Sequence, residues 1–155
     1  MEKENEIKNH KKISFGIPKA ELHIHVTGSI EPEKVVHLSQ KNKIGDFNNV
    51  EEIRKQFNFT CLMNYLKLLN DCQIVLKEED DFADIMYEYL KKSAIQGLVY
   101  AEIMFLPQFF LRKGVKLETM IRGYWKGIEK GKKDFNILSE LILLIDRGAP
   151  ETEAL

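Results

Sequence analysis

The feature that most constrains the fold is a nearly continuous apolar run, LVYAEIMF at 98–105, between two helical patterns. Its length is that of a strand, and a run that is apolar on both sides of the pleat predicts a strand buried on both faces. Gly97 precedes the run and Pro107 follows it, and both residue types favour a strand boundary. Because such a strand needs helices on its faces, the chain is predicted to be an α/β protein.

Two further strands are predicted, AELHIHV at 20–26 and SELILLI at 139–145. Apolar residues at helical spacing predict the helices between them, which span 32–42, 51–57, 61–75, 78–96 and 117–134. Strands that alternate with helices are typical of a parallel sheet covered by helices. An open doubly wound sheet and a (β/α)8 barrel both fit this order. A dinucleotide-binding sheet is disfavoured because GxGxxG does not follow the first strand.

A few residues predict the ends of the helices and one helix contact. Pro32 suits a first helical turn, Thr60 is a candidate N-cap, and Gly97 suits the position after a helix C-terminus. The last helix carries a glycine at every fourth position: Gly123, Gly127 and Gly131. Charged residues surround this row, so it predicts close packing against another helix and not a membrane motif.

The composition fits one core and not two domains, with 155 residues of which 44% are hydrophobic. A net charge of −1 gives no bulk attraction to nucleic acid or to an anionic membrane, and no apolar run is long enough to span a membrane. Residues 1–16 are predicted to be a polar tail without a secretion signal, followed by a single domain at 17–155. Cys61 and Cys72 are expected to be buried, inert thiols of a cytoplasmic protein.

The predicted elements stop soon after the third strand. A complete (β/α)8 barrel takes about 250 residues, and three strands cannot close one. The third strand would then present an open edge and uncovered apolar surface. The pattern leaves two alternatives, a small three-stranded domain or part of a larger fold.

The strongest sign of chemistry is the His-x-His pattern in the first strand. Alternate residues of a strand share a face, so Glu21, His23 and His25 are predicted on a polar face that looks into a lumen or a cleft. The residues between and after them are expected to face the helices: Leu22, Ile24 and Val26. Two imidazoles can converge on one metal ion, although a zinc site needs at least three protein ligands. Hydrogen bonding to neighbouring polar groups is the alternative role of the pair.

Two further observations bear on this pattern. The histidines stand near the C-terminal end of a first strand, just before a glycine turn and a helix, where barrel enzymes place their chemistry. His37, in the first predicted helix, is expected to face solvent and is a poor candidate for a third ligand.

The segment PKAELHIHVTGSIEPE at 18–33 resembles the N-terminal motif of the adenosine deaminase family, a branch of the metal-dependent amidohydrolases. The resemblance continues in the family's order through FNFTCLMNYL, EEDDFADIMYEYL, GLVYAEIMFLPQ, RKGVKLETMIRGYWKGI and LILLIDR. It implies a (β/α)8 barrel with one Zn2+ ion at its C-terminal mouth, of which this chain would hold about three strands of eight. In that family the metal activates a water that attacks C6 of a purine, and ammonia leaves.

Residue by residue, His23 and His25 match the family's first two zinc ligands. Thr27 stands where many adenosine deaminases have an aspartate that contacts the ribose, so His25 and Thr27 are expected beside the substrate. Thr27 keeps a hydroxyl but not the charge, and a hydrogen bond to the turn backbone is its alternative role.

The resemblance also assigns an apolar gate over the purine to three residues whose helical spacing first predicts core positions: Leu62, Tyr65 and Leu66. Glu102 interrupts an apolar strand, where a carboxylate is costly unless paired, so an ion pair with an Arg or Lys of a neighbouring strand is predicted for it. Its alternative role is to face the lumen and support the site. Asp146 and Arg147 end the third strand and are expected to pair with each other or with a loop.

No residue of the chain matches the family's third histidine ligand, its aspartate ligand, its catalytic glutamate or the histidine that orients the attacking water. The resemblance implies zinc-dependent conversion of adenosine to inosine and ammonia for the family. The isolated chain, by contrast, is predicted to be inactive and prone to aggregate.

Two alternatives stay open and a third fails. The segments NFT, LPQ and RKGV also resemble the adenine deaminase branch, whose substrate is the free base. A non-catalytic fragment that needs a complementary C-terminal polypeptide is the other alternative. A cytidine-deaminase site is excluded because Thr27, and not a glutamate, stands two residues after His25.

Overall fold

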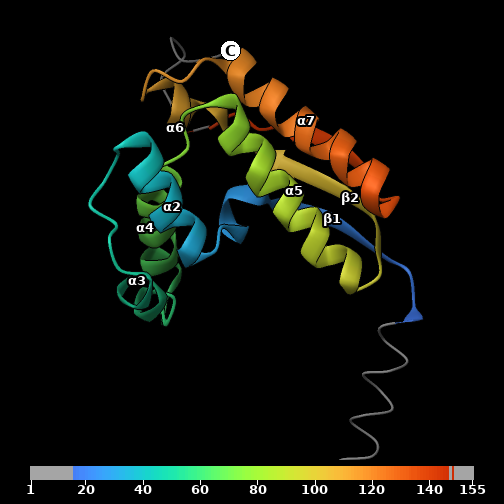
Figure 1. The fold of residues 1–155 in the computed structure, drawn as a ribbon, viewed down its shortest axis with the longest axis horizontal. Coiled ribbons are helices and arrows are strands. Elements are labelled where there is room, and N and C mark those ends of the chain that lie inside the picture. Colours follow the sequence, from blue (N-terminus) through green and yellow to red (C-terminus); the bar gives the residue numbers. More distant parts are fainter. Residues whose placement is uncertain (1–15, 147, 149–155) are drawn as a thin grey trace, which may run out of the picture.

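The structure, a computed structural model, describes residues 16–146 and 148. A three-stranded parallel sheet in the order β1-β2-β3 forms its centre. The strands are β1 (Lys19–His25), β2 (Leu98–Phe105) and β3 (Leu138–Leu143). Two long helices, α5 (Glu79–Ile95) and α7 (Leu117–Phe135), lie side by side over one face of the sheet (Figure 1). The prediction of an α/β fold with a parallel sheet is confirmed.

The connection from β1 to α5 is long and contains four short elements. They are η1 (Val26–Ser29), α2 (Pro32–Asn42), α3 (Val50–Gln56) and α4 (Leu62–Gln73). Figure 1 shows α2, α3 and α4 grouped to one side of the sheet. A further helix, α6 (Pro107–Leu111), follows β2 and was not expected, because five residues are too few to show a helical period.

Most helix ends follow the predicted signals. Pro32 occupies the first turn of α2, and Gly97 follows the C-cap of α5 with φ +85°, a conformation that glycine adopts without strain. The prediction of Thr60 as an N-cap is wrong. Cys61 takes that position in α4 and makes no side-chain capping bond.

The glycine row of α7 packs against α5, as predicted. A Cβ at Gly127 would lie 2.6 Å from the carbonyl oxygen of Ala83 and 2.6 Å from the Cβ of Met86. Gly123 and Gly131 meet α5 in the same way. Because the backbones approach so closely, no larger residue fits the row without moving a helix.

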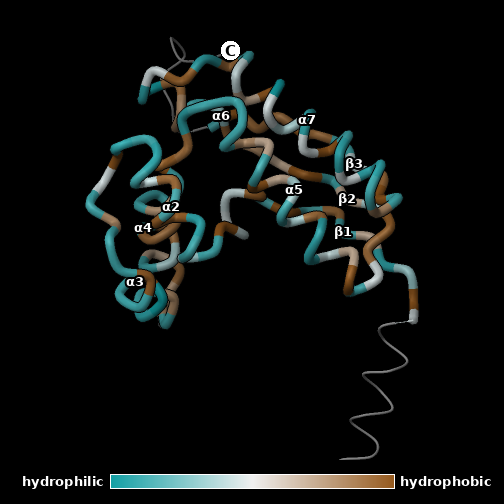
Figure 2. The backbone as a smooth tube through the Cα atoms, in the orientation of Figure 1, coloured by the Kyte–Doolittle hydropathy of each residue, from teal (hydrophilic) through white to brown (hydrophobic). Residues whose placement is uncertain are grey.

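The core lies between the sheet and these two helices and continues into α2, α3 and α4. Ala101, Ile103 and Phe105 of β2 point into it, and Figure 2 shows the hydrophobic stretch of β2 running beneath α5 and α7. The ring of Tyr124 lies 5.2 Å from that of Phe82 and 5.3 Å from that of Phe105, both in edge-on contact. These contacts fix α5 and α7 to the C-terminal half of β2.

β1 departs from the regular alternation that the sequence predicts. Glu21 pairs with Ala101 of β2, and the next paired residue, Ile24, matches Ile103. β1 therefore advances three residues while β2 advances two, which is the geometry of a β-bulge. A bulge reverses the face on which the following side chains appear.

The bulge corrects two predictions about β1. Glu21 does not share a face with the histidines; its carboxylate accepts a 2.6 Å hydrogen bond from the Tyr89 hydroxyl of α5. Leu22, expected to face the helices, is 59% exposed. Ile24 packs against the core and Val26 is fully buried, as predicted.

β3 is less buried than its sequence suggests, because it forms an open edge of the described sheet. Leu138 is 53% exposed, Leu143 38% and Ile145 59%. The uncovered apolar edge that the sequence analysis expects is thus present.

The remaining expectations have mixed outcomes. Cys72 is buried, and burial raises the pKa of its thiol to about 11, but Cys61 is exposed, contrary to prediction. His37 is exposed, as predicted. Within the described ranges no helix is long and apolar enough to cross a membrane. The predicted tail at 1–16 lies outside the described residues except for Gly16.

Candidate metal and substrate site

His23 and His25 lie together on the face of the sheet that the helices leave uncovered. Their ring centroids are 5.4 Å apart and the rings are inclined at 43°. His25 pairs with Met104 of β2 and is half-buried, whereas His23 is exposed. Because η1 begins at Val26, the pair stands at the C-terminal end of β1. The structure therefore brings together the two histidines that the sequence predicts as ligands.

The environment of His25 favours its neutral imidazole. Burial lowers the pKa of His25, and repulsion from His23 lowers it further. The neutral form is the one that binds a metal ion. Across residues 16–146 and 148, no three His, Cys, Asp or Glu side chains come together in a way that could hold a metal ion. Among the described residues, His23 and His25 are therefore two candidate metal ligands without a third beside them.

Thr27 lies in η1, two residues after His25, and is half-buried. The hydroxyl that bonds the backbone of this turn belongs to Ser29, which donates to the carbonyl oxygen of Val26 at 2.7 Å. In the part of the chain that the structure describes, no hydrogen bond joins the Thr27 side chain to another residue. The turn-bonding role expected as its alternative is therefore wrong.

Helix α4 presents an apolar surface beside this turn. The Tyr65 hydroxyl approaches Gly28 so closely that a Cβ there would lie 2.7 Å from it. Leu62 is 67% exposed and Leu66 39%, so the expectation that they are core residues is wrong. The core contact of α4 comes instead from residues such as Leu68. The exposed leucines are available to cover a ligand.

Glu102 shares the open face with the histidines. The register places it beside Glu140 of β3, and the Tyr100 hydroxyl donates to its carboxylate at 3.2 Å. Burial of Tyr100 and this hydrogen bond raise the pKa of the Tyr100 hydroxyl. No ion pair of Glu102 with a described residue is present, so the predicted ion pair is wrong. The open face consequently carries carboxylates as well as imidazoles.

Asp146, just after β3, contacts a loop, as expected. Its carboxylate lies 3.8 Å from the Arg112 guanidinium and accepts a 2.9 Å hydrogen bond from the backbone of Gly148. The pairing expected with Arg147 lies outside the described residues.

Gln108, which follows β2 at the same end of the sheet as the histidines, was not predicted from the sequence. Its side chain is 1% exposed, and neither amide atom has a hydrogen-bond partner among the described residues. Pro107 is the residue that could have indicated the position of Gln108. It follows the end of β2 by two residues and begins helix α6.

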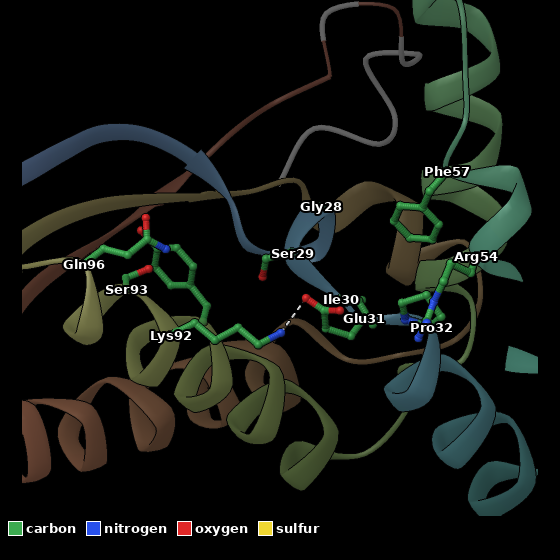
Figure 3. A pocket seen from close by; sticks show the side chains of 11 residues that line it. Gly28, Ser29, Ile30, Glu31, Pro32, Arg54, Phe57, Lys92, Ser93 and Gln96 are labelled. Carbon is green, nitrogen blue, oxygen red and sulfur yellow. Dashed lines mark hydrogen bonds and ion pairs between the residues drawn. The ribbon is translucent and has the colours of Figure 1, made fainter. Parts of the chain in front are cut away.

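Two cavities lie beside the free edge of β1, and neither is lined by a histidine. One, of about 440 Å³, is bounded by η1, the start of α2, the end of α3 and the second half of α5 (Figure 3). Figure 3 shows Lys92 of α5 bonded to Glu31 on one side, with Arg54 and Phe57 on the other. Neither histidine lines this cavity, so it is separate from the candidate metal site.

Comparison with known proteins relates these features to a family. Residues 18–154 match the family described as Adenosine deaminase. The chain is 41% identical to the adenine deaminase of Wolinella succinogenes over 144 residues, which are 92% of this chain and 44% of that protein.

Solved structures agree with the sequence match. The adenine deaminase from Arthrobacter aurescens superposes with a TM-score of 0.82 at 35% identity, over 87% of this chain and 42% of that one. An amidohydrolase from Burkholderia ambifaria with bound Zn superposes with a TM-score of 0.79 at 26% identity, over 93% of this chain and 40% of that one. The chain spans less than half the length of these relatives, so its sheet is part of a (β/α)8 barrel, as predicted. The chain belongs to the adenosine deaminase family.

Proposed function

We propose that this chain supplies two zinc ligands and part of the purine site of a hydrolytic deaminase barrel, and that the purine is adenine. The observation that carries the proposal is the placement of His23 and His25, with rings 5.4 Å apart, at the C-terminal end of β1. In a (β/α)8 barrel that end of the strands forms the catalytic mouth.

His23 and His25 fit two of the ligand positions of a zinc ion. Both imidazoles lie on one open face, and the lowered pKa of His25 keeps it in the form that binds metal. A bound zinc ion lowers the pKa of water to about 7, which makes a nucleophile available at neutral pH. The remaining ligands and the proton-transferring groups would come from polypeptide outside this chain, because no described third ligand is near the pair.

The substrate side of the site is formed by the segment after β1 and by α4. Thr27 offers an unpaired hydroxyl near His25, and the exposed Leu62 and Leu66 offer an apolar surface for a planar ring. Tyr65, held against Gly28, connects this surface to the turn that carries Thr27.

Adenine is supported better than adenosine, the substrate that the resemblance first implies. The relatives from W. succinogenes and A. aurescens are both named adenine deaminases.

The test is an assay of ammonia release on the chain co-expressed with the unmatched portion of the W. succinogenes enzyme and loaded with zinc. We expect adenine to be preferred over adenosine by about a hundredfold in kcat/KM. His23→Ala should abolish activity, and His37→Ala, on the exposed face of α2, should not. Equal use of adenosine would contradict the substrate, and activity in His23→Ala would contradict the site.

A non-catalytic role remains the second candidate, because the metal ligands in the described chain are incomplete. It predicts a complex with a complementary polypeptide that binds purine without releasing ammonia. The isolated chain should release no ammonia under either proposal. A cytoplasmic location stays a prediction, for which the free state of both cysteines is the supporting observation.

A further inference from the structure

A further cavity lies between the start of α5 and the start of α7, on the side of the sheet that these helices cover (Figure 1). Its volume is about 480 Å³, which is in the range of small-molecule sites. Three segments bound it: the loop after α2, the connection from α4 to α5, and the loop from α6 to α7. Neither histidine lines this cavity, so it is separate from the candidate metal site.

The floor of the cavity is aliphatic. Leu76 is 2% exposed and Val115 is 8% exposed, and both belong to the hydrophobic core. Ile44 and Ile74 line the cavity with them and are only half-buried. Covering the exposed parts of such side chains with apolar atoms removes both surfaces from water, which is favourable. The floor therefore suits the apolar part of a ligand.

The rim of the cavity is cationic, since three lysines line it: Lys77, Lys113 and Lys116. The single carboxylate of the lining belongs to Glu78, which accepts from the backbone of Asp81 in the capping box of α5 and lies 3.9 Å from Lys77. No ion pair joins Lys113 or Lys116 to a residue in the described part of the chain. Because the whole chain has a net charge of −1, this positive charge is a local feature.

The charge of the rim favours a phosphate monoester over a carboxylate. A phosphate monoester carries a charge of about −1.5 to −2 at neutral pH, whereas a carboxylate carries a single negative charge. Ammonium groups act as separate point charges, so three lysines can contact different oxygens of one phosphate. Thr119 adds a half-buried hydroxyl to the lining.

We propose that this cavity, which we call the lysine cavity, binds a small phosphate monoester. The apolar body of the ligand lies on the aliphatic floor, and its phosphate lies among Lys77, Lys113 and Lys116. The ligand joins the connection after α4 to the loop before α7, two segments that are distant in sequence. Because it binds only the folded chain, it raises the temperature of unfolding. The proposal rests on neither the zinc site nor the identity of the purine.

Hexyl phosphate is the probe, because it combines a short alkyl chain with one phosphate. It is added to the full 155-residue chain labelled with carbon-13 at the methyl groups of isoleucine, leucine and valine. We expect the methyl resonances of Ile44, Ile74 and Val115 to shift and those of Ile24, in the strand that carries the histidines, to stay unchanged. Inorganic phosphate and hexanol should each bind at least about tenfold more weakly, since each supplies only one part of the contact.

Adenosine monophosphate, titrated in parallel, distinguishes two sources of the same chemistry. Tighter binding of the nucleotide than of hexyl phosphate, with shifts of the same methyl groups, supports the proposal with a nucleotide as the natural ligand. Tighter binding of hexyl phosphate supports it with an aliphatic phosphate.

Substitutions of the lysines test the rim. Lys113→Gln and Lys116→Gln should each weaken hexyl phosphate about fivefold, the upper range for one exposed ion pair, and Lys113→Arg should retain most of the affinity. Lys133→Gln is the matched control, because Lys133 lies in the last turn of α7, at the opposite end of the helix from Lys116. It should leave the affinity unchanged. Circular dichroism of each variant verifies that it is folded.

Three results would overturn the proposal: methyl shifts that fall outside the lysine cavity, inorganic phosphate that binds as tightly as hexyl phosphate, or a loss of affinity in Lys133→Gln equal to that in Lys113→Gln. The last result would identify nonspecific attraction to lysines. His23→Ala should bind hexyl phosphate as the unmodified chain does, so failure of the zinc site and failure of the lysine cavity are distinguishable.

Discussion

The two faces of the three-stranded sheet carry different kinds of side chain. The face beneath α5 and α7 presents residues such as Ile103, which is fully buried, and Phe105, which is 3% exposed. The opposite face presents His23, His25 and Glu102, all exposed or half-buried. One face is packed and the other is polar and open.

Within one strand, the residues that stabilise the fold and the residues that could bind a ligand therefore lie on opposite faces. Because neighbouring residues of a strand alternate between faces, a side chain can change on one face while the packing on the other is kept. Substitutions on the helix-covered side should therefore lower the free energy of unfolding, and substitutions on the open side should change ligand binding alone. Four variants test this separation.

The largest effect is expected for Gly127→Ala in the packed layer. The new Cβ would meet the Ala83 carbonyl oxygen and the Met86 Cβ at 2.6 Å, so α5 and α7 must separate. We expect a loss of about 3 kcal/mol in the free energy of unfolding, measured by urea denaturation. Gly16→Ala is the control, since nothing lies within 4 Å of its added Cβ. Equal stability of the two variants would show that the layer is not tightly packed.

Asp81 tests a polar group on the packed side. Its fully buried carboxylate accepts hydrogen bonds from Lys41 at 2.6 Å, Asn42 at 2.7 Å and the Glu78 backbone at 2.8 Å. Burial opposes its ionisation, but these hydrogen bonds outweigh burial and hold the pKa of Asp81 below its ordinary value. Asp81→Asn should therefore cost about 2 kcal/mol at pH 7.

The same residue gives a pH dependence with a defined sign. Because the folded pKa of Asp81 is lower than the unfolded one, its contribution is present above about pH 4 and is lost as the pH falls through the folded value. Denaturation measured from pH 7 downwards should show a smaller acid loss for Asp81→Asn than for the unmodified chain. Asp84→Asn, at a 56% exposed side chain, is the control and should keep the loss.

A substitution on the open face should change ligand binding and leave the free energy of unfolding nearly unchanged. His23→Ala removes an exposed imidazole, so the free energy of unfolding should change by no more than about 0.5 kcal/mol. Zinc affinity of the chain, measured by calorimetric titration, should fall at least about tenfold. His37→Ala serves as the control for nonspecific binding. If His37→Ala weakens zinc binding as much as His23→Ala does, the strand is not the metal site.

One substitution should stabilise the protein. Gln108 buries an amide whose two polar atoms have no partner among the described residues, so Gln108→Leu should raise the free energy of unfolding by about 1 kcal/mol. The matched control is Gln73→Leu, because Gln73 is also buried but donates to Asn70 at 2.9 Å. That variant should be destabilised. A loss of stability in Gln108→Leu would mean that its amide is satisfied in solution.

Local patterns predicted the parts of the fold that depend on neighbouring residues. Gly97 after α5 and the glycine row of α7 are examples, because each reflects a backbone requirement that few residue types meet. The proximity of His23 and His25 was also predictable, because residues two apart in an extended strand lie close together. The family's motif then indicated which metal such a pair suits.

The errors arose where distant segments decide the outcome. The bulge that turns Glu21 toward Tyr89 is visible only in the register with β2. Leu62 and Leu66 have the spacing of core residues, but the structure places no packing partner over them within the described chain. Glu102 was assigned an ion pair because its neighbour across the sheet, Glu140, could not be known from local sequence.

The long connection between β1 and α5 has a consequence for the order of folding. The segment from α5 through β3 is contiguous in sequence, whereas β1 must join β2 across residues 26–97. Closing that loop costs conformational entropy before the contacts between β1 and β2 can form and offset it. We therefore expect the unit of α5, β2, α7 and β3 to form first. Pulse-labelling hydrogen exchange should protect Ile103 in β2 before Ile24 in β1. β1, which carries the two histidines, would then be the last strand to join the sheet. Metal binding would be a late step in the folding of the protein.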